Sequence, residues 1–205
     1  MEDKALIVFI KNPELGRVKT RLAADLGEAT ALEIYLSLLD HTRKTAIGIE
    51  ANRYIYYSRF IEEEDEWHTR HFQKALQAGT SLGQRMTNAF EEVLNKHEKA
   101  IIIGSDCPGI NPDLIHLGFD LLSVSDVVLG PSIDGGYYLI GLKRPQPQLF
   151  TKMPWSSDKV LPETRKRLRE SRLLWEELPV LADIDVANDW EQWGWPLSST
   201  DDQSW

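Results

Sequence analysis

The chain is poor in several features that mark particular classes of protein. Cys107 is its only cysteine, so an intramolecular disulfide is excluded, and we expect a small packed side chain there. No apolar run approaches the roughly 20 residues of a membrane-spanning helix. The apolar stretch 5–10 is too short for a signal peptide and follows acidic residues. These absences predict a cytoplasmic protein that has no membrane partner.

Positive charge is also scarce. The chain has 23 lysine and arginine residues against 32 aspartate and glutamate residues, which gives a formal net charge of −9 at pH 7. Such a balance argues against a nucleic-acid partner. An acidic protein that binds phosphates needs a local concentration of cations and a metal ion to offset its carboxylates. A cluster of cations beside carboxylates would therefore indicate phosphate binding here.

The hydrophobic pattern predicts a single α/β domain over residues 1–205. Apolar, β-rich runs alternate with segments of helical periodicity, and no internal repeat, low-complexity tract or linker interrupts them. This alternation predicts a three-layer α/β/α, Rossmann-like fold with a mostly parallel, mixed sheet. The expected strands are 5–10, 52–58, 100–104, 126–130, 136–142 and 179–184, and the expected helices are 28–47, 81–95, 111–122, 158–169 and 188–193.

One strand is expected to run against the others. Only a Gly-rich turn around 134–136 separates the runs 126–130 and 136–142. Because a parallel crossover needs a dozen or more residues, 136–142 is predicted to be antiparallel to 126–130. Tyr137 and Tyr138 follow this turn, which does not itself require them. Either could stack on a base or a sugar, while core packing takes at least one of the two.

Cations gather in the loop after the first predicted strand. Lys11, Arg17, Lys19 and Arg21 lie within eleven residues, and Gly16 would allow a phosphate to approach the backbone closely. Ligands of open α/β sheets bind at the carboxyl ends of strands, and the helix expected next would offer free N–H groups to an anion. The loop matches neither the Walker A nor the dinucleotide-binding pattern. Taken alone, it could also be a solvated basic loop.

Aspartates follow two other predicted strands. Asp106 comes after the buried run 100–104, and Asp183 and Asp185 lie at the end of 179–184. Mg²⁺ is commonly held by one or two protein carboxylates together with substrate phosphates. Alternation along a strand would place Asp183 and Asp185 on one side, so either could supply a second ligand beside Asp106. The alternative for each aspartate is to cap a following helix.

Six segments occur in order along the chain: Lys11-x-Pro-x-x-Gly16-x-Val-Lys19-Thr20-Arg21-Leu22, Leu82-Gly83-Gln84-Arg85-Met86, Gly104-Ser-Asp106-Cys-Pro108, Gly130-Pro-x-x-Asp134-Gly-Gly-Tyr-Tyr-Leu-Ile-Gly-Leu142, Trp155-Ser156-Ser157 and Asp183-Ile-Asp185. Together they resemble the bacterial DUF2064 family of glycosyltransferase-like proteins, over residues 5–190. That family belongs to the nucleotide-diphospho-sugar transferase superfamily with the GT-A fold. Its relatives include 2-phospholactate guanylyltransferase and the molybdenum-cofactor nucleotidyltransferases.

The resemblance implies a metal-dependent transferase with a small-molecule acceptor. Asp106 stands for the superfamily's metal-binding aspartate after the central strand. Asp185 matches the first residue of the relatives' Asp-Thr-Pro-Glu-Asp segment, although 185–189 departs from it at three of five positions. The implied metal ligands for Mg²⁺ are thus Asp106 and Asp185. The catalytic candidates are Lys19, Asp106 and Asp134, and the substrate-binding candidates are Lys11, Gly16, Arg17, Lys19, Arg21, Arg85, Gly135, Gly136 and Tyr137.

Three functions remain open at this point. A glycosyltransferase would move a sugar from a nucleotide sugar, with Asp134 contacting sugar hydroxyls or acting as a base. A nucleotidylyltransferase would attack a nucleoside triphosphate and release pyrophosphate, with Lys19 and Arg21 neutralising the phosphates. A nucleotide-binding regulator would bind without turnover. The tail lies outside the family pattern, and we expect packing or an interface from its tryptophans, Trp190, Trp193, Trp195 and Trp205.

Overall fold

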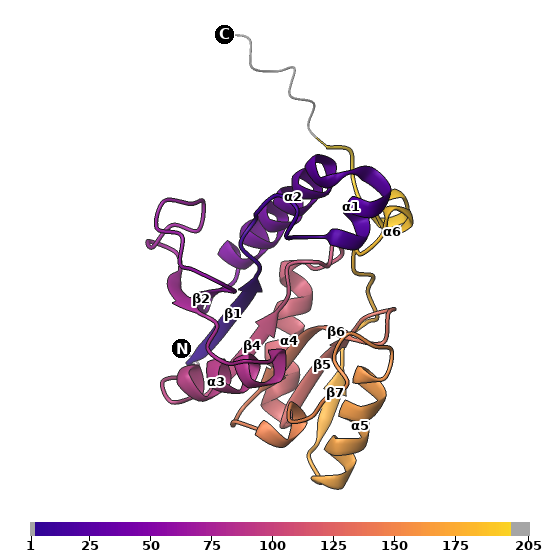
Figure 1. Ribbon diagram of the computed structural model, residues 1–205. Coiled ribbons are helices and arrows are strands. Elements are labelled where there is room, and N and C mark those ends of the chain that lie inside the picture. The colour runs from indigo at the N-terminus through magenta and orange to yellow at the C-terminus, as the bar shows by residue number, and fades with distance from the viewer. Residues whose placement is uncertain (1–2, 198–205) are drawn as a thin grey trace.

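The computed structural model describes residues 3–197. Seven strands form one sheet in the order β3-β2-β1-β4-β6-β5-β7 (Figure 1). Every neighbouring pair is parallel except those of β6, which is antiparallel to β4 and β5. The mostly parallel, mixed sheet and its antiparallel strand are therefore confirmed. The strands are β1 (Lys4–Ile10), β2 (Asn52–Tyr57), β3 (Gln73–Leu76), β4 (Lys99–Ile103), β5 (Val127–Pro131), β6 (Tyr137–Leu142) and β7 (Trp175–Glu177).

Helices cover both faces of the sheet, which makes three layers (Figure 1). Successive residues of a strand point to opposite faces. Accordingly, Leu6 and Val8 belong to one hydrophobic cluster, whereas Ala5 and Ile7 belong to another. The first cluster contains residues of α2 and α4, and the second contains residues of α3 and α5. The helices are α1 (Thr20–Leu26), α2 (Glu28–Ile47), α3 (Leu82–Leu94), α4 (Pro112–Val124), α5 (Val160–Glu170) and α6 (Ala187–Trp193), with a short 3₁₀ turn η1 (Pro147–Leu149).

A third, smaller cluster joins α1, α2 and α6 at one end of the domain. Trp190 and Trp195 pack against it, and the Trp195 indole N–H donates to Ser37 Oγ at 2.7 Å. These two tryptophans therefore pack as expected. Trp193 is 46% exposed, and Trp205 lies outside the described residues.

The prediction of the last strand, over residues 179–184, was wrong. The run 179–184 is not a strand: β7 comes earlier, and beyond it only Leu181 forms an isolated bridge, to Ser132. Pro179 explains the interruption, because it has no N–H to continue the ladder. β3 was also missed, since its four residues are polar or half-exposed and carry no clear alternation.

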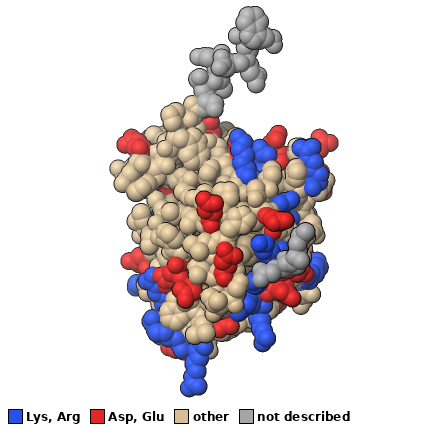
Figure 2. All heavy atoms as spheres, turned by 180° about the vertical axis from the view of Figure 1, so that it is seen from behind, with Lys and Arg blue, Asp and Glu red and all other residues tan. Residues whose placement is uncertain are grey.

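The outer surface carries both signs of charge. On the face seen from behind, acidic and basic side chains are interspersed (Figure 2). Among residues 3–197, no helix is long and apolar enough to cross a bilayer. Cys107 is buried, and burial raises the pKa of its thiol to about 12. That environment fits a packed residue rather than a nucleophile.

Candidate functional site

The candidate site lies at the topological switch point of the sheet. β1 and β4 are neighbours, but the chain leaves β1 toward β2 on one side and returns to β4 on the other. Open α/β sheets bind ligands at such a point, at the carboxyl ends of their strands. Lys11 directly follows β1, and Asp106 follows β4 closely. The Ile184 N–H donates to the Asp106 carbonyl at 2.9 Å, so a third segment, distant in sequence, joins them.

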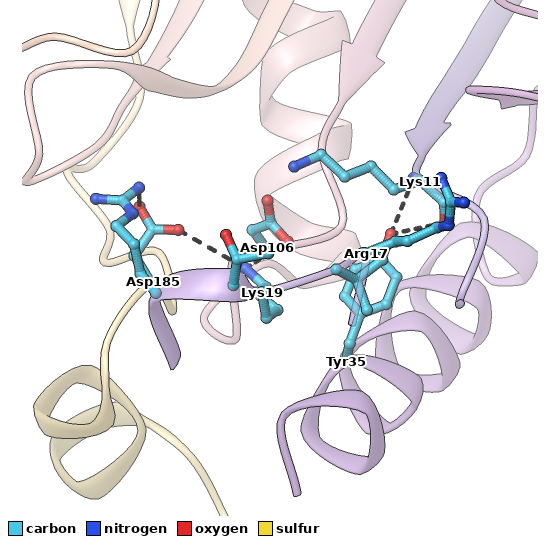
Figure 3. Close-up of a pocket in the computed structure, with 9 residues that line it drawn as sticks. Lys11, Arg17, Lys19, Tyr35, Asp106 and Asp185 are labelled. Carbon is cyan, nitrogen blue, oxygen red and sulfur yellow. Dashed lines mark hydrogen bonds and ion pairs between the residues drawn. The ribbon is translucent and has the colours of Figure 1, made fainter. Parts of the chain in front are cut away.

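Lys19 connects the two predicted metal ligands. Its Nζ lies 2.6 Å from Asp106 Oδ1 and 3.9 Å from Asp185 Oδ1, and it donates to the Ile184 carbonyl at 2.5 Å. The Lys19 side chain is only 5% exposed. In Figure 3 the side chains of Lys19, Asp106 and Asp185 converge on one another. The two carboxylates thus face a common cationic nitrogen.

The surrounding residues form what we call the basic pocket, a cavity of about 90 Å³. Arg21 pairs with Asp185 at 2.6 Å. Arg17 is 62% exposed and lies 3.7 Å from Glu14, and the exposed Lys11 forms no ion pair with any described residue. Lys11 and Arg17 are therefore the cations whose charge is least neutralised by the protein. The pocket is lined by Lys11, Arg17, Val18, Lys19, Thr20, Arg21, Tyr35, Asp106 and Asp185.

The carboxylates of this pocket fit a divalent cation. Asp106 and Asp185 offer hard oxygen ligands on two sides of the Lys19 ammonium, and both are partly exposed. Among residues 3–197, no group of three histidine, cysteine, aspartate or glutamate side chains could hold a metal ion. An ion here would need ligands from elsewhere, which suits Mg²⁺ because it usually keeps water and substrate phosphate ligands.

Neither aspartate acts as a helix cap. Asn111 caps α4 by accepting the Leu114 N–H at 3.1 Å. Asp189 Oδ2 accepts the N–H groups of Asp185 and Val186, at 2.9 and 3.0 Å, at the start of α6. Asn111 and Asp189 therefore cap these helices, and the side chains of Asp106 and Asp185 remain in the pocket.

Tyr35 links the end of β1 to the end of β4, and its role was missed from the sequence. Its Oη donates to the Lys11 carbonyl at 3.0 Å, accepts the Lys11 N–H at 2.9 Å, and lies 3.3 Å from Ser105 Oγ. Burial, followed by the charge of Asp106, raises the pKa of Tyr35 well above its usual range. The hydroxyl therefore stays protonated and holds Lys11 beside the Asp106 segment. In the sequence Tyr35 belongs only to the apolar face of a helix.

Asn12 anchors the start of the same loop. It is 3% exposed, and its Oδ1 accepts the Arg59 N–H at 3.0 Å while its Nδ2 donates to the Phe60 carbonyl at 2.9 Å. Glu14 also pairs with Arg59. The loop is thereby fixed to the segment after β2. An asparagine two residues after a strand was the only available signal.

A larger cleft of about 520 Å³ adjoins the basic pocket and shares Lys11, Arg21, Asp106 and Asp185 with it. Part of its wall is the turn between β5 and β6. Gly135 has φ 87°, and a Cβ there would lie 2.6 Å from the Asp158 backbone, so glycine is required. The remaining lining residues are Phe9, Leu82, Met86, Ile102, Gly104, Asp134, Gly136, Tyr137, Tyr138, Leu139, Ile140, Trp155, Ser156, Ser157, Asp158, Val160 and Asp183.

The two tyrosines of the turn differ in their surroundings. Tyr138 is buried and donates to the Pro179 carbonyl at 3.0 Å, so it packs in the core. Tyr137 lines the cleft, with its ring edge-on to Trp155 at 6.3 Å between centroids. Its hydroxyl is buried and has no hydrogen-bond partner among the described residues. Core packing therefore takes Tyr138, as expected of one of the pair.

Asp183 also faces the cleft. Burial raises its pKa to about 7, and the nearby Asp106 and Asp134 carboxylates act in the same direction, whereas Ser132 and Lys19 oppose them. Asp183 therefore keeps its proton to a higher pH than an ordinary aspartate does. Asp134 lies at the surface, and its Oδ1 accepts the Gly136 N–H at 2.9 Å.

Arg85 and Gly16 do not contact the pocket cations. Arg85 lines neither cavity: it donates to the Gly79 carbonyl at 3.1 Å and to Gln77 Oε1 at 3.4 Å. Gln77 in turn donates to carbonyls at the ends of β1 and β2. Gly16 has φ 71° in the loop and lines neither cavity. A role for either in substrate binding stays a prediction.

Several solved structures share this fold. A protein from Desulfovibrio desulfuricans G20, provisionally assigned as a nucleotide-diphospho-sugar transferase, has a TM-score of 0.83 at 28% identity, covering 91% of this chain and 84% of that chain. A cytidylyltransferase from Leptospira borgpetersenii serovar Hardjo-bovis has a TM-score of 0.60 at 12% identity, covering 95% and 86%. Rv0371C of Mycobacterium tuberculosis H37Rv, solved with manganese, has a TM-score of 0.52 at 15% identity, covering 93% and 97%.

The last two likenesses show the fold alone, whereas the first also agrees with the expected enzyme class, a transferase. No curated protein sequence is similar enough to count as a match. The model of one bacterial family, described as uncharacterized protein conserved in bacteria (DUF2064), matches residues 42–157 and so includes the Asp106 and Asp134 segments but not the basic loop. The chain belongs to the DUF2064 family.

Proposed function

We propose that the chain is a divalent-metal-dependent transferase whose basic pocket holds the phosphates of a nucleotide donor. One observation carries the proposal: Lys19 lies between Asp106 and Asp185, in a pocket also lined by Lys11 and Arg17. A pocket with that charge pattern can bind phosphate oxygens and a metal together. The donor is a nucleotide sugar or a nucleoside triphosphate.

The residues divide the work by position. Lys11 and Arg17, whose charges are largely free, bind phosphate oxygens. Asp106 and Asp185 would hold Mg²⁺, which when bound would stabilise negative charge on the leaving phosphate. Lys19 lies beside both carboxylates, and its positive charge offsets the repulsion between them. Tyr35 keeps Lys11 beside the Asp106 segment.

Sugar transfer to a hydroxyl acceptor in the adjoining cleft is the first candidate reaction. The acceptor oxygen forms a bond to the sugar carbon, and the bond from that carbon to the phosphate oxygen breaks. The electron pair stays on the nucleoside diphosphate that leaves. The hydroxyl proton passes to Asp134, whose Oδ1 binds the Gly136 N–H and whose Oδ2 is free to accept it.

Nucleotidylyl transfer is the second candidate, favoured by the number of cations. Four lysine and arginine residues within eleven positions of the chain line a single pocket, which is more than a diphosphate needs. The structural neighbours also include a cytidylyltransferase. In this reaction the acceptor attacks the α-phosphorus, and pyrophosphate leaves with the electron pair.

A thermal-shift panel of nucleoside triphosphates and nucleotide sugars, with and without Mg²⁺ or Mn²⁺, tests the proposal. A donor at ~100 times its dissociation constant should stabilise the protein by about 2.7 kcal/mol, and only with metal. Lys11→Ala should weaken this stabilisation. Arg144→Ala is the matched control. Arg144 is exposed and lies just beyond β6, at the end of the sheet where β4 begins and away from the candidate site.

Measured products then separate the candidates. Nucleoside diphosphate release indicates sugar transfer, pyrophosphate release indicates nucleotidylyl transfer, and metal-dependent binding without either product indicates a regulator. If no nucleotide stabilises the protein in the presence of metal, or if Lys11→Ala behaves like Arg144→Ala, the proposal is wrong.

A further inference from the structure

The part of the cleft away from the basic pocket carries a different set of charges. Its carboxylate residues are Asp134, Asp158 and Asp183, which we call the acidic side. Among the described residues that line the cleft, the only cations are Lys11 and Arg21, and both also line the basic pocket. An acceptor bound beside the acidic side therefore meets negative charge and no lysine or arginine.

The two glycine N–H groups of the β5–β6 turn offer no substitute for the missing cations. The Gly135 N–H donates to the Ser132 carbonyl at 3.1 Å, and the Gly136 N–H donates to Asp134 Oδ1 at 2.9 Å. A glycine-rich turn binds anions through free N–H groups. Here both glycine N–H groups are already used within the protein.

The start of α5 is closed to anions in the same way. The Val160 N–H donates to the Ser157 carbonyl at 3.3 Å, the Leu161 N–H donates to the Gly135 carbonyl at 2.8 Å, and Pro162 has no N–H. Helix N-termini attract anions because their first N–H groups are unpaired. Asp158 lies just before this helix and adds a negative charge at the position where an anion would otherwise bind.

Apolar side chains line this part of the cleft beside Ser156 and Ser157. Leu82, Met86, Trp155 and Val160 line it, and Leu82 is 44% exposed. Apolar side chains next to carboxylates suit a compound that offers hydroxyl groups on one side and carbon atoms on the other, as a sugar or polyol does.

From this charge distribution we infer that the acceptor is a hydroxyl compound without phosphate or carboxylate groups. The inference rests on the proposed function, because it concerns the second substrate of the same reaction. A phosphorylated acceptor would place its charge beside Asp134 and Asp158, and no lysine or arginine among the described residues lines this part of the cleft to offset it. The transfer is the one written above, in which a hydroxyl oxygen is the nucleophile and its proton passes to Asp134.

Matched pairs of acceptors test the inference: glycerol against glycerol 3-phosphate, myo-inositol against inositol 1-phosphate, and glucose against glucose 6-phosphate. Each is added to the protein loaded with Mg²⁺ and the donor from the thermal-shift panel, and release of the leaving group is measured. At least one neutral member should accelerate release, with its phosphorylated twin weaker by about tenfold or more. Asp158→Lys should narrow that gap. Asp120→Lys, an exposed change on α4 that does not line the cleft, should leave it as in the wild type.

The inference is overturned if the phosphorylated twins work as well as the neutral ones, if no neutral member accelerates release, or if Asp158→Lys leaves the gap unchanged. Donor binding is read separately, by the metal-dependent thermal shift without acceptor. Loss of that shift in the wild type refutes the proposed function itself. A normal shift with a preference for phosphorylated acceptors refutes only the acceptor class.

Discussion

In the basic pocket, four cations come from one segment of eleven residues, whereas the acidic side of the cleft takes its three carboxylates from segments far apart in the chain. The first region can bind anions, because Lys11 and Arg17 are largely unneutralised. The second repels them, because its charges have one sign and the N–H groups of Gly135 and Gly136 are already used within the protein. The two regions meet at Asp106 and Asp185, which line both. A transfer reaction needs such a division when the donor is anionic and the acceptor is not.

The largest expected effect comes from removing the charge at the meeting point. Asp106→Asn keeps the side-chain shape but takes one carboxylate from the metal and from Lys19. Metal-dependent nucleotide binding should fall by about 10²-fold or more, by the scale of metal-site substitutions. Calorimetric titration with and without Mg²⁺ measures it. Asp120→Asn on α4 is the control. Unchanged metal-dependent binding in Asp106→Asn would mean that the metal does not bind at Asp106 in the basic pocket. The comparison between the basic pocket and the acidic side would then fail.

A smaller effect is expected from Tyr35→Phe, which removes only one hydroxyl. The change deletes the hydrogen bonds to Lys11 and the contact with Ser105, so Lys11 should lose its fixed position. One such bond contributes about 1 kcal/mol, and a tenfold effect corresponds to about 1.4 kcal/mol. The Michaelis constant for the donor should rise by about tenfold, with the acceptor preference unchanged.

Tyr57→Phe is the matched control for this variant. It also deletes a buried tyrosine hydroxyl bond, to Asp65 at 2.6 Å, but Tyr57 lines neither cavity. Equal changes in donor Michaelis constant for both variants would mean that Tyr35 acts through stability alone. A change confined to Tyr35→Phe would mean that the Tyr35 hydroxyl supports donor binding in the basic pocket through its hydrogen bonds to Lys11.

The same contrast explains how much could be predicted from the sequence. Lys11, Lys19 and Arg21 are near neighbours in the chain, so their clustering is visible without a structure. Buried runs predicted the sheet, and the short turn at 134–136 predicted its antiparallel strand. Asp158 was not recognised, because nothing in its own segment shows that Gly135 packs against it. Tyr35 was read as core for the same reason. Contacts between distant segments depend on the fold. Pro179 shows that one residue without an N–H can prevent a strand that was predicted over residues 179–184.

The smallest expected effect concerns Asp183 and sharpens the comparison from the acidic side. Burial, together with Asp106 and Asp134, raises the pKa of Asp183 to about 7 in the folded protein, above its usual value of 3.8. The folded state therefore binds this proton more tightly than the unfolded state does. The resulting stability is present below about pH 4 and is lost as the pH rises through 7.

Asp183→Asn removes that pH dependence. Relative to the wild type, the variant should gain thermal stability between pH 5 and pH 8, by about 2–4 °C for each kcal/mol in a domain of this size. Melting temperatures measured in EDTA, so that no metal shifts the titration, provide the check, with the exposed Asp120→Asn as the control. Because Asp183 does not line the basic pocket, donor affinity should change little. A difference in melting temperature that stays constant from pH 5 to pH 8 would mean that Asp183 is ionised throughout. A large loss of donor affinity would instead show that Asp183 acts with Asp106 on the donor, so the two regions would not be separate.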